Sequence, residues 1–163
     1  MFLLNVLYQQ LINPRLVIGE GESIKDKVFI FNPKYEDENF YYLDNFKIEK
    51  QITKEIIKNT KIKSKEDIKN NKLRIIFPYE NGKLISEEKF KEKFPNTYEY
   101  LLFHKEVLLK RDKGKKRYEN WYAFGRTQGI KNLFGKKILT PSIGKRPIFI
   151  YCDKESALYQ KIF

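Results

Sequence analysis

The feature that most constrains the fold is one long helical pattern set among short, strand-like segments. Between Pro95 and Arg111, apolar side chains recur every three to four residues, the spacing that places them on one face of a helix. Proline is well tolerated at the first helical position, and Lys110 with Arg111 suits the negative end of the helix dipole. The side chains expected to face the core are Tyr98, Leu101, Leu102, Leu108 and Leu109.

The rest of the chain offers only short apolar segments. Strand-like runs occupy residues 15–18, 26–31, 40–43, 46–48, 73–79, 137–140 and 147–151. Residues 2–12 and the spacing of Ile52, Ile56 and Ile57 indicate further helices. Strands and helices do not alternate as a βαβ fold requires. The sequence therefore predicts an α+β fold with small mixed or antiparallel sheets and a long central helix, Pro95–Arg111.

Local signals mark turns, caps and boundaries. Ser64 and Ser86 each precede a helix-like segment and are expected to cap it. Asn81 and Gly82 are the residue types that a tight hairpin needs for its two positive φ angles. The segment 60–71 is the expected mobile connection. A length of 163 residues suits a single domain, residues 1–163, which can equally be a fragment of a larger enzyme.

Cysteine and histidine usage excludes several kinds of site. Cys152 is the only cysteine and His104 the only histidine, so no internal disulfide can form. A zinc site built from the usual thiolate and imidazole ligands is excluded for the same reason. No apolar run reaches the roughly 18 residues of a membrane span, and residues 1–4 lack the basic leader of a signal peptide. We therefore expect a cytoplasmic protein without a membrane partner.

Positive charge is concentrated in about a quarter of the chain. Residues 105–146 carry 13 Lys and Arg against three acids, which leaves ten of the chain's net charge of +12 in this segment. Residues 1–45 carry four basic and seven acidic side chains. A clustered positive field favours a polyanionic partner, and nucleic acid is the commonest one. The aromatic residues interleaved with the cations are Trp121, Tyr122, Phe124 and Phe134.

The order of several short motifs resembles a known DNA-specificity domain. The motifs are Phe94–Leu101, Leu108–Arg111, Trp121-Tyr122 followed by Arg126, and Lys137–Pro141. This succession is similar to the TaqI-like target recognition domain of adenine-N6 DNA methyltransferases and type II restriction–modification enzymes, which serve in phage defence. The N-terminal half fits the same pattern, with a Gly-containing segment before Lys27–Ile30 and a later strand, Ile75–Tyr79.

The resemblance implies a module that grips double-stranded DNA and selects its sequence. In that family a separate catalytic domain binds S-adenosylmethionine and methylates an adenine flipped out of the duplex. The partners implied are double-stranded DNA and that methyltransferase domain, in the same polypeptide or as a separate subunit. No cofactor is expected in this chain, and S-adenosylmethionine, with Mg²⁺ if DNA is also cut, would belong to the parent enzyme.

The candidate DNA-binding residues fall into three groups by chemistry. Cations at the helix end and in the following loop suit phosphate contacts, which set register without reading sequence. They are Lys110, Arg111, Lys113, Lys115, Lys116 and Arg117. Arg126 and Gln128 suit base reading, because their side chains match guanine and adenine edges. The cations that can line the same groove are Lys131, Lys136, Lys137, Lys145 and Arg146.

Catalytic interpretations find less support in the residues. Asn32–Tyr35 approaches the Asn-Pro-Pro-Tyr loop of amine methylation, but Lys34 replaces the second proline. A small Mg²⁺-dependent nuclease needs acids beside a Lys, and such strings arise by chance in a chain with 33% charged residues. A packing or surface role is favoured for His104, and a core role for Trp121 and Tyr122. A basic interaction domain that docks on a separate methyltransferase subunit remains an alternative.

Overall fold

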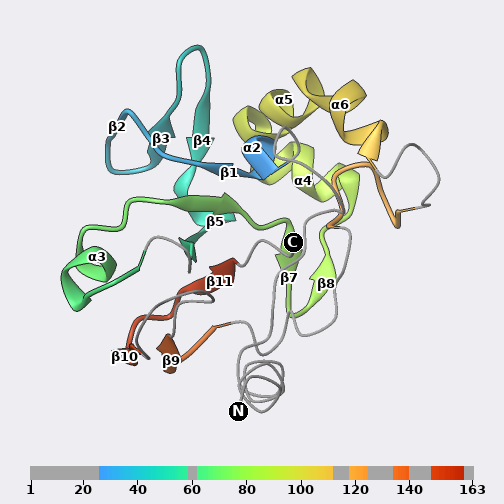
Figure 1. Cartoon of the computed structure of the whole chain (residues 1–163). Helices are drawn as coiled ribbons and strands as arrows, with labels where there is room; N and C mark the ends of the chain where they lie inside the picture. Colours follow the sequence, from blue (N-terminus) through green and yellow to red (C-terminus); the bar gives the residue numbers. More distant parts are fainter. Residues whose placement is uncertain (1–25, 59–61, 112–117, 125–133, 140–147, 160–163) are drawn as a thin grey trace. The chain divides into compact units, whose positions relative to one another are not determined.

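The structure, a computed structural model, describes residues 26–58, 62–111, 118–124, 134–139 and 148–159. Its helices and small sheets form an α+β fold (Figure 1). The chain divides into two compact units. Unit 1 comprises residues 1–17, 55–71 and 127–163, and unit 2 comprises residues 18–54 and 72–126. Each unit therefore joins segments that are distant in sequence.

Unit 2 is built from short antiparallel pairs. β1 (Ile30–Phe31) pairs with β6 (Arg74–Ile76), and β3 (Phe40–Tyr42) pairs on its two sides with β2 (Tyr35–Glu36) and β4 (Lys47–Glu49). β7 (Tyr79–Glu80) and β8 (Lys83–Leu84) form a hairpin. Asn81 and Gly82 turn this hairpin at φ 51° and 75°, which confirms the expected turn.

Three consecutive helices, α4 to α6, follow the β7–β8 hairpin in unit 2. α4 (Glu87–Lys93) begins after Ser86, whose hydroxyl accepts a hydrogen bond from the Lys89 backbone N, as expected of a cap. α5 (Pro95–Phe103) packs on β4 and against α4, and α6 (Lys105–Leu109) follows after one residue. The buried aromatic and aliphatic side chains that form the core here are Phe29, Ile48, Ile75, Ile76, Phe90, Leu101, Leu108 and Tyr122.

The helix expected over 95–111 is interrupted at His104. Its backbone N donates to the Leu101 carbonyl three residues back, a tightened last turn. The imidazole packs against Phe46, Tyr100 and Phe103, with ring centroids 4.8–6.4 Å away. Two of the side chains expected in the core face solvent instead. Leu102 is 45% exposed and Leu109 is 56% exposed.

Among the described residues, unit 1 contains one helix, three complete strands and most of β5. α3 (Lys65–Lys69) lies where we expected a mobile connection. It begins at Ser64, which forms the expected reciprocal capping box with Asp67. β9 (Lys137–Leu139) and β10 (Ile150–Cys152) pair antiparallel. β11 (Ala157–Tyr159) runs parallel to the end of β5 (Thr53–Lys58), whose first residues belong to unit 2.

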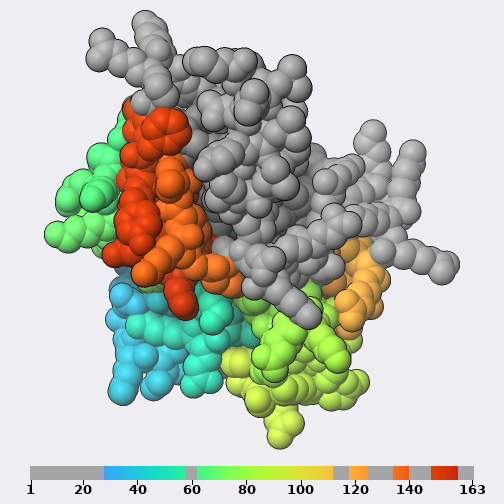
Figure 2. All heavy atoms as spheres, turned by 90° about the horizontal axis from the view of Figure 1, so that it is seen from below, coloured from blue at the N-terminus to red at the C-terminus, as the bar shows by residue number. Residues whose placement is uncertain are grey.

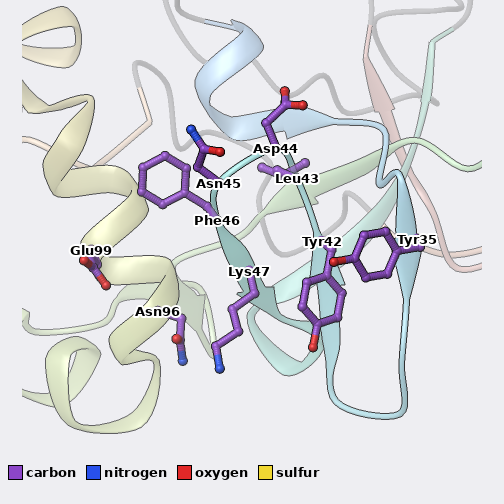
Figure 3. Close-up of a pocket in the computed structure, with 9 residues that line it drawn as sticks. All are labelled: Tyr35, Tyr42, Leu43, Asp44, Asn45, Phe46, Lys47, Asn96 and Glu99. Carbon is purple, nitrogen blue, oxygen red and sulfur yellow. The ribbon is translucent and has the colours of Figure 1, made fainter.

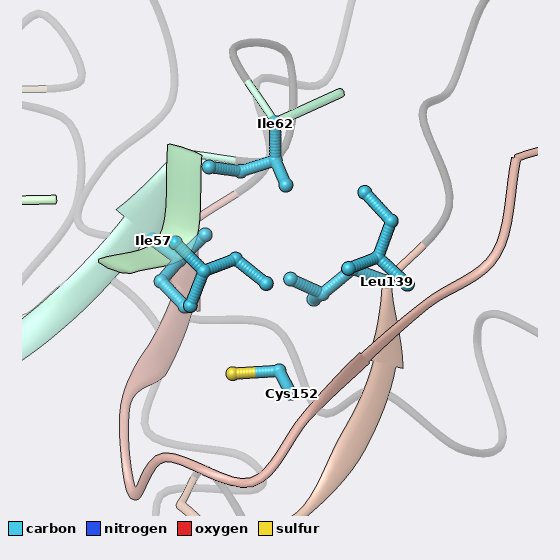
Figure 4. Packing of buried hydrophobic residues seen from close by; sticks show 6 residues of the cluster. Ile57, Ile62, Leu139 and Cys152 are labelled. Atoms are coloured by element: carbon cyan, nitrogen blue, oxygen red, sulfur yellow. The ribbon is translucent and has the colours of Figure 1, made fainter. Parts of the chain in front are cut away.

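A small apolar cluster forms the core of unit 1. Ile57 from β5, Ile68 from α3, Leu139 from β9 and Cys152 from β10 are all at most 5% exposed. Ile62 and Ile150 join them, and the labelled side chains point toward one another in Figure 4. One face of the β9–β10 hairpin thus packs its apolar side chains into this core.

Two further expected elements are wrong. Residues 26–29 form a short helix, α2, and only Ile30–Phe31 is strand. Residues 53–58 form the strand β5 after a 3₁₀ turn, η1 (Lys50–Ile52), instead of a helix. Ile56 and Ile57 are both fully buried, so β5 lacks the alternation that identifies a strand covered on one face. The segments 2–12 and 15–18 lie outside the described residues.

Candidate nucleic-acid interface

Arg111 is a buried clamp at the end of α6. Its side chain is fully buried, and its guanidinium and Nε donate to three backbone carbonyls. The acceptors are Leu108 at 2.8 Å, Trp121 at 2.6 Å and Ala123 at 2.7 Å. The guanidinium carbon also lies 4.1 Å from the ring centre of Tyr118. Arg111 therefore ties the end of α6 to residues 118–123.

This clamp joins the two flanks of the basic segment 112–117. Arg111 precedes the segment and Tyr118 follows it, and the two are in contact. The segment itself, with Lys113, Lys115, Lys116 and Arg117, lies outside the described residues. The structure gives Arg111 a different role from the phosphate contact that we expected. Three of its N–H groups donate to carbonyls, and its side chain is fully buried.

A second anchor precedes the segment that carries Arg126 and Gln128. The Phe124 backbone N donates to the Tyr79 hydroxyl at 2.7 Å, and the Phe124 ring packs against Phe29 and Phe77. Burial raises the pKa of Tyr79 to about 12, so its hydroxyl stays neutral. The neighbouring Tyr122 hydroxyl donates to the Ile85 carbonyl at 2.7 Å. Arg126, Gln128 and Lys131 lie beyond Phe124, outside the described residues.

The aromatic pair of the motif is mostly structural. Tyr122 is fully buried, which confirms its expected core role. Trp121 is half-buried, and its indole N donates to Glu87 at 3.3 Å. Glu87 also accepts a 2.6 Å hydrogen bond from the Tyr98 hydroxyl, and this bond holds the Glu87 pKa below its usual value. Lys105, in α6, lies over the Trp121 ring with its ammonium 5.0 Å from the ring centre.

The described candidate cations divide into exposed and buried residues. Lys110 is exposed and its ammonium lies 3.8 Å from the Glu106 carboxylate. Lys136 is exposed, whereas Lys137 is 9% exposed and donates to the Ser156 carbonyl. Burial lowers the pKa of Lys137. Like Arg111, Lys137 therefore has an internal role instead of the expected groove contact. Lys145 and Arg146 lie outside the described residues.

Sequence reasoning missed two exposed aromatic residues beside β9. Phe149 is 64% exposed and Tyr151 is 51% exposed on the outer side of the hairpin. The run Ile148–Cys152 is apolar at every position, so its period cannot show which side faces out. Only the inward packing of Ile150 and Cys152 identifies the outer side.

A shallow hollow lies elsewhere in unit 2, between the β2–β4 sheet and α5 (Figure 3). Its volume is about 340 Å³, and Tyr35 and Tyr42 stack at one side with ring centroids 4.4 Å apart. Lys47, Asn96 and Glu99 line the other side. Of the expected DNA-binding residues that the structure describes, none lines this hollow.

Metal and membrane features are not found in the described part of the chain. Within it, no three His, Cys, Asp or Glu side chains gather as a metal site would require. No helix there combines the length and the apolar character needed to cross a membrane. Comparison with known proteins finds no match to a protein-family model or to a curated protein sequence.

Proposed function

We propose that this chain is a sequence-specific recognition module for double-stranded DNA, belonging to an adenine-N6 DNA methyltransferase or restriction–modification enzyme. The chain itself would lack the catalytic centre. S-adenosylmethionine, and Mg²⁺ if the parent enzyme also cuts DNA, would bind to the catalytic part, which is either fused to this chain or a separate subunit. The motif order from Phe94 to Pro141 is the basis for naming this enzyme class.

The observation that carries the DNA-binding part of the proposal is the Arg111 clamp. Segment 112–117 contains four cations and one acid, and both of its flanking residues meet at this buried guanidinium. Six residues whose two flanking residues are in contact cannot spread far along the chain, so the fields of their charges add. Duplex DNA carries one negative charge per about 1.7 Å of axis, and it is a polyanion that can match such a density.

The charge pattern beyond the clamp supports the same partner. Residues 120–152 contain no Asp or Glu but six Lys and Arg: Arg126, Lys131, Lys136, Lys137, Lys145 and Arg146. Even with Lys137 buried, five of them remain as candidates for phosphate or base contacts. A segment without carboxylates presents no local repulsion to a phosphate backbone.

The test is the salt dependence of duplex binding. Fluorescence anisotropy of a labelled duplex is measured at several NaCl concentrations. If about five phosphates are neutralised, the logarithm of the affinity falls with the logarithm of salt concentration at a slope of about −4.5. A slope near zero, or no binding at low salt, would remove the proposal.

Two matched variants locate the contact surface. Replacing Lys113, Lys115, Lys116 and Arg117 by Gln removes four cations and should bring the slope to about −1. The control removes four exposed lysines elsewhere, Lys63, Lys65, Lys69 and Lys83, and changes the net charge equally. If the salt dependence of binding weakens equally in both variants, net charge alone drives binding and segment 112–117 is not the contact.

Sequence selection is tested at Arg126. The preferred site is first selected from a random duplex library. Arg126→Ala should then lose about 1–3 kcal/mol of discrimination at one base position while binding to unrelated sequences changes little. Equal weakening on every sequence would assign Arg126 to a phosphate contact instead.

A further inference from the structure

The β9–β10 hairpin has one packed face and one open face. Leu139, Ile150 and Cys152 point into the core of unit 1 and are at most 5% exposed. The alternate positions point outward: Ile138 is 49% exposed, Tyr151 is 51% exposed, and Phe149, directly before β10, is 64% exposed. Tyr151 stands opposite Ile138 in the register. The atoms of β9 and β10 form part of the surface visible in Figure 2.

The two aromatic rings on this open face are far enough apart for each to contact its own flat ligand. Phe149 and Tyr151 are two residues apart on one side of an extended segment, which places them roughly 6.6 Å apart along the chain. Among the described residues, neither ring stacks on another aromatic. Each ring can therefore receive one flat partner. Exposed aromatic residues at alternate strand positions are the arrangement that sheet-based domains use to stack unpaired bases.

The charged residues near the open face indicate that its partner is negatively charged. Lys136 is exposed and lies two residues before Ile138, at the same alternation. The connection between β9 and β10 carries Lys145 and Arg146 in its sequence and no acid. The first carboxylate after residue 119 is Asp153, which is exposed and directly follows β10. A partner that offers both flat rings and negative charge matches this surface, and a nucleic-acid strand has both.

Other occupants match less well. A second copy of this chain would bring the same basic sequence, residues 120–152 with six cations and no acid, to the interface, which disfavours self-association. In a duplex the base faces are covered by their neighbours, so stacking on Phe149 and Tyr151 needs at least two unpaired bases. An acidic protein satisfies the charge but does not require two separate rings.

We propose that the outer face of the β9–β10 hairpin binds an unpaired nucleic-acid strand, with one base stacked on Phe149, a second on Tyr151, and Lys136 close to a phosphate. This inference goes beyond duplex recognition, because it gives the chain a second mode of contact, with single-stranded nucleic acid. It stands on unit 1 alone and does not require segment 112–117.

The test uses the full chain and a fluorescein-labelled oligothymidylate of about 12 nucleotides. The variant Phe149→Leu/Tyr151→Leu keeps the apolar surface and removes both ring faces. Base stacking on aromatics predicts that it binds the strand at least about 20-fold more weakly, with the salt slope unchanged. Tyr151→Phe keeps the ring and should bind as the unaltered chain does. Phe103→Leu removes a ring that is 72% exposed in unit 2 and serves as the matched control.

The same proteins are titrated with a fully paired duplex, so the two proposals can fail separately. Loss of strand binding with duplex binding retained supports the hairpin site. A loss below about 3-fold in the double variant overturns it, whatever happens with the duplex. An equal loss in Phe103→Leu also overturns it. Sedimentation velocity decides the remaining case: a dimer that becomes monomeric in the double variant would assign the face to self-association. Near-ultraviolet circular dichroism confirms that each variant is folded.

Discussion

Arg111 shows how one side chain can be misjudged from sequence and still matter for the site. As a cation at a helix end it suggests a surface contact, but it is fully buried and bonded to three carbonyls. Without it, those carbonyls would be left in an apolar environment without their donor. Under the proposed function its contribution to DNA binding would be indirect, because it connects the two flanks of segment 112–117.

We expect Arg111→Met to lower the free energy of unfolding by about 3 kcal/mol, because buried acceptors lose charged donors. Urea denaturation followed by fluorescence measures this change. The neighbouring Lys110→Met alters an exposed cation and should stay within about 0.5 kcal/mol. Similar effects for the two variants would mean that the clamp contributes nothing to stability.

Glu49 acts as a cap that comes from another element. Its carboxylate on β4 accepts the Asn96 backbone N at 2.9 Å, the Asn96 Nδ2 at 2.7 Å and the Thr97 backbone N at 2.8 Å, all in the first turn of α5. The Thr97 hydroxyl donates to it as well. Burial opposes ionisation, but the hydrogen bonds outweigh it and hold the Glu49 pKa below its usual value.

This lowered pKa fixes the sign of a pH dependence. The ionised Glu49 stabilises the fold fully above the ordinary value of 4.5, and the contribution is lost as the pH falls through the lower folded pKa. Glu49→Gln should therefore lower the free energy of unfolding by about 2 kcal/mol near pH 7. The difference in free energy of unfolding between Glu49→Gln and the unaltered chain should become smaller below pH 4.5. Urea denaturation across this range measures the gap, and a constant gap would contradict the assignment.

At the scale of elements, local signals predicted more than apolar periodicity did. The Asn81-Gly82 turn and the Ser64 and Ser86 caps were predicted correctly, because each depends on contacts within a few residues. β5 was predicted wrongly because its two adjacent isoleucines are both buried. β11 was not predicted at all. It pairs with residues about 100 positions earlier, and no local pattern reports such pairing.

The same limit explains why the sequence did not show which candidate cations are buried. Lys136 and Lys137 are identical in sequence terms, yet only Lys137 meets the carbonyl of Ser156 and is buried. Which of two adjacent lysines turns inward depends on the register of β9 against β10, where Lys137 faces Cys152. Charge counting therefore locates a basic region, but it cannot separate structural cations from those that contact a ligand.

The β7–β8 turn provides a test at the element scale. Gly82 has φ 75°, so Gly82→Ala should lower the free energy of unfolding by about 1–2 kcal/mol. Asn81 also has positive φ, and Asn81→Gly introduces the residue that tolerates it best, so a change within about 0.5 kcal/mol is expected. Thermal or urea denaturation compares the two. Equal losses would show that the turn conformation is not the cause.

At the scale of the whole molecule, the net charge of +12 opposes compactness. Moderate NaCl shortens the range of this repulsion, so the urea midpoint should rise between low salt and about 0.2 M. The variant that replaces the four cations of segment 112–117 by Gln should be more stable at low salt and respond less to NaCl. A midpoint that falls with added salt in both proteins would show that attractive ion pairs dominate instead.

Unit 1 carries its own indicator of local opening. Cys152 is the only cysteine and is 1% exposed, with Leu139 and Ile57 beside it in the core. A thiol reagent can reach its sulfur only after β10 leaves that packing. The rate at which Cys152 is alkylated in the unaltered chain therefore measures how often β10 leaves the core of unit 1. The measurement needs no added label.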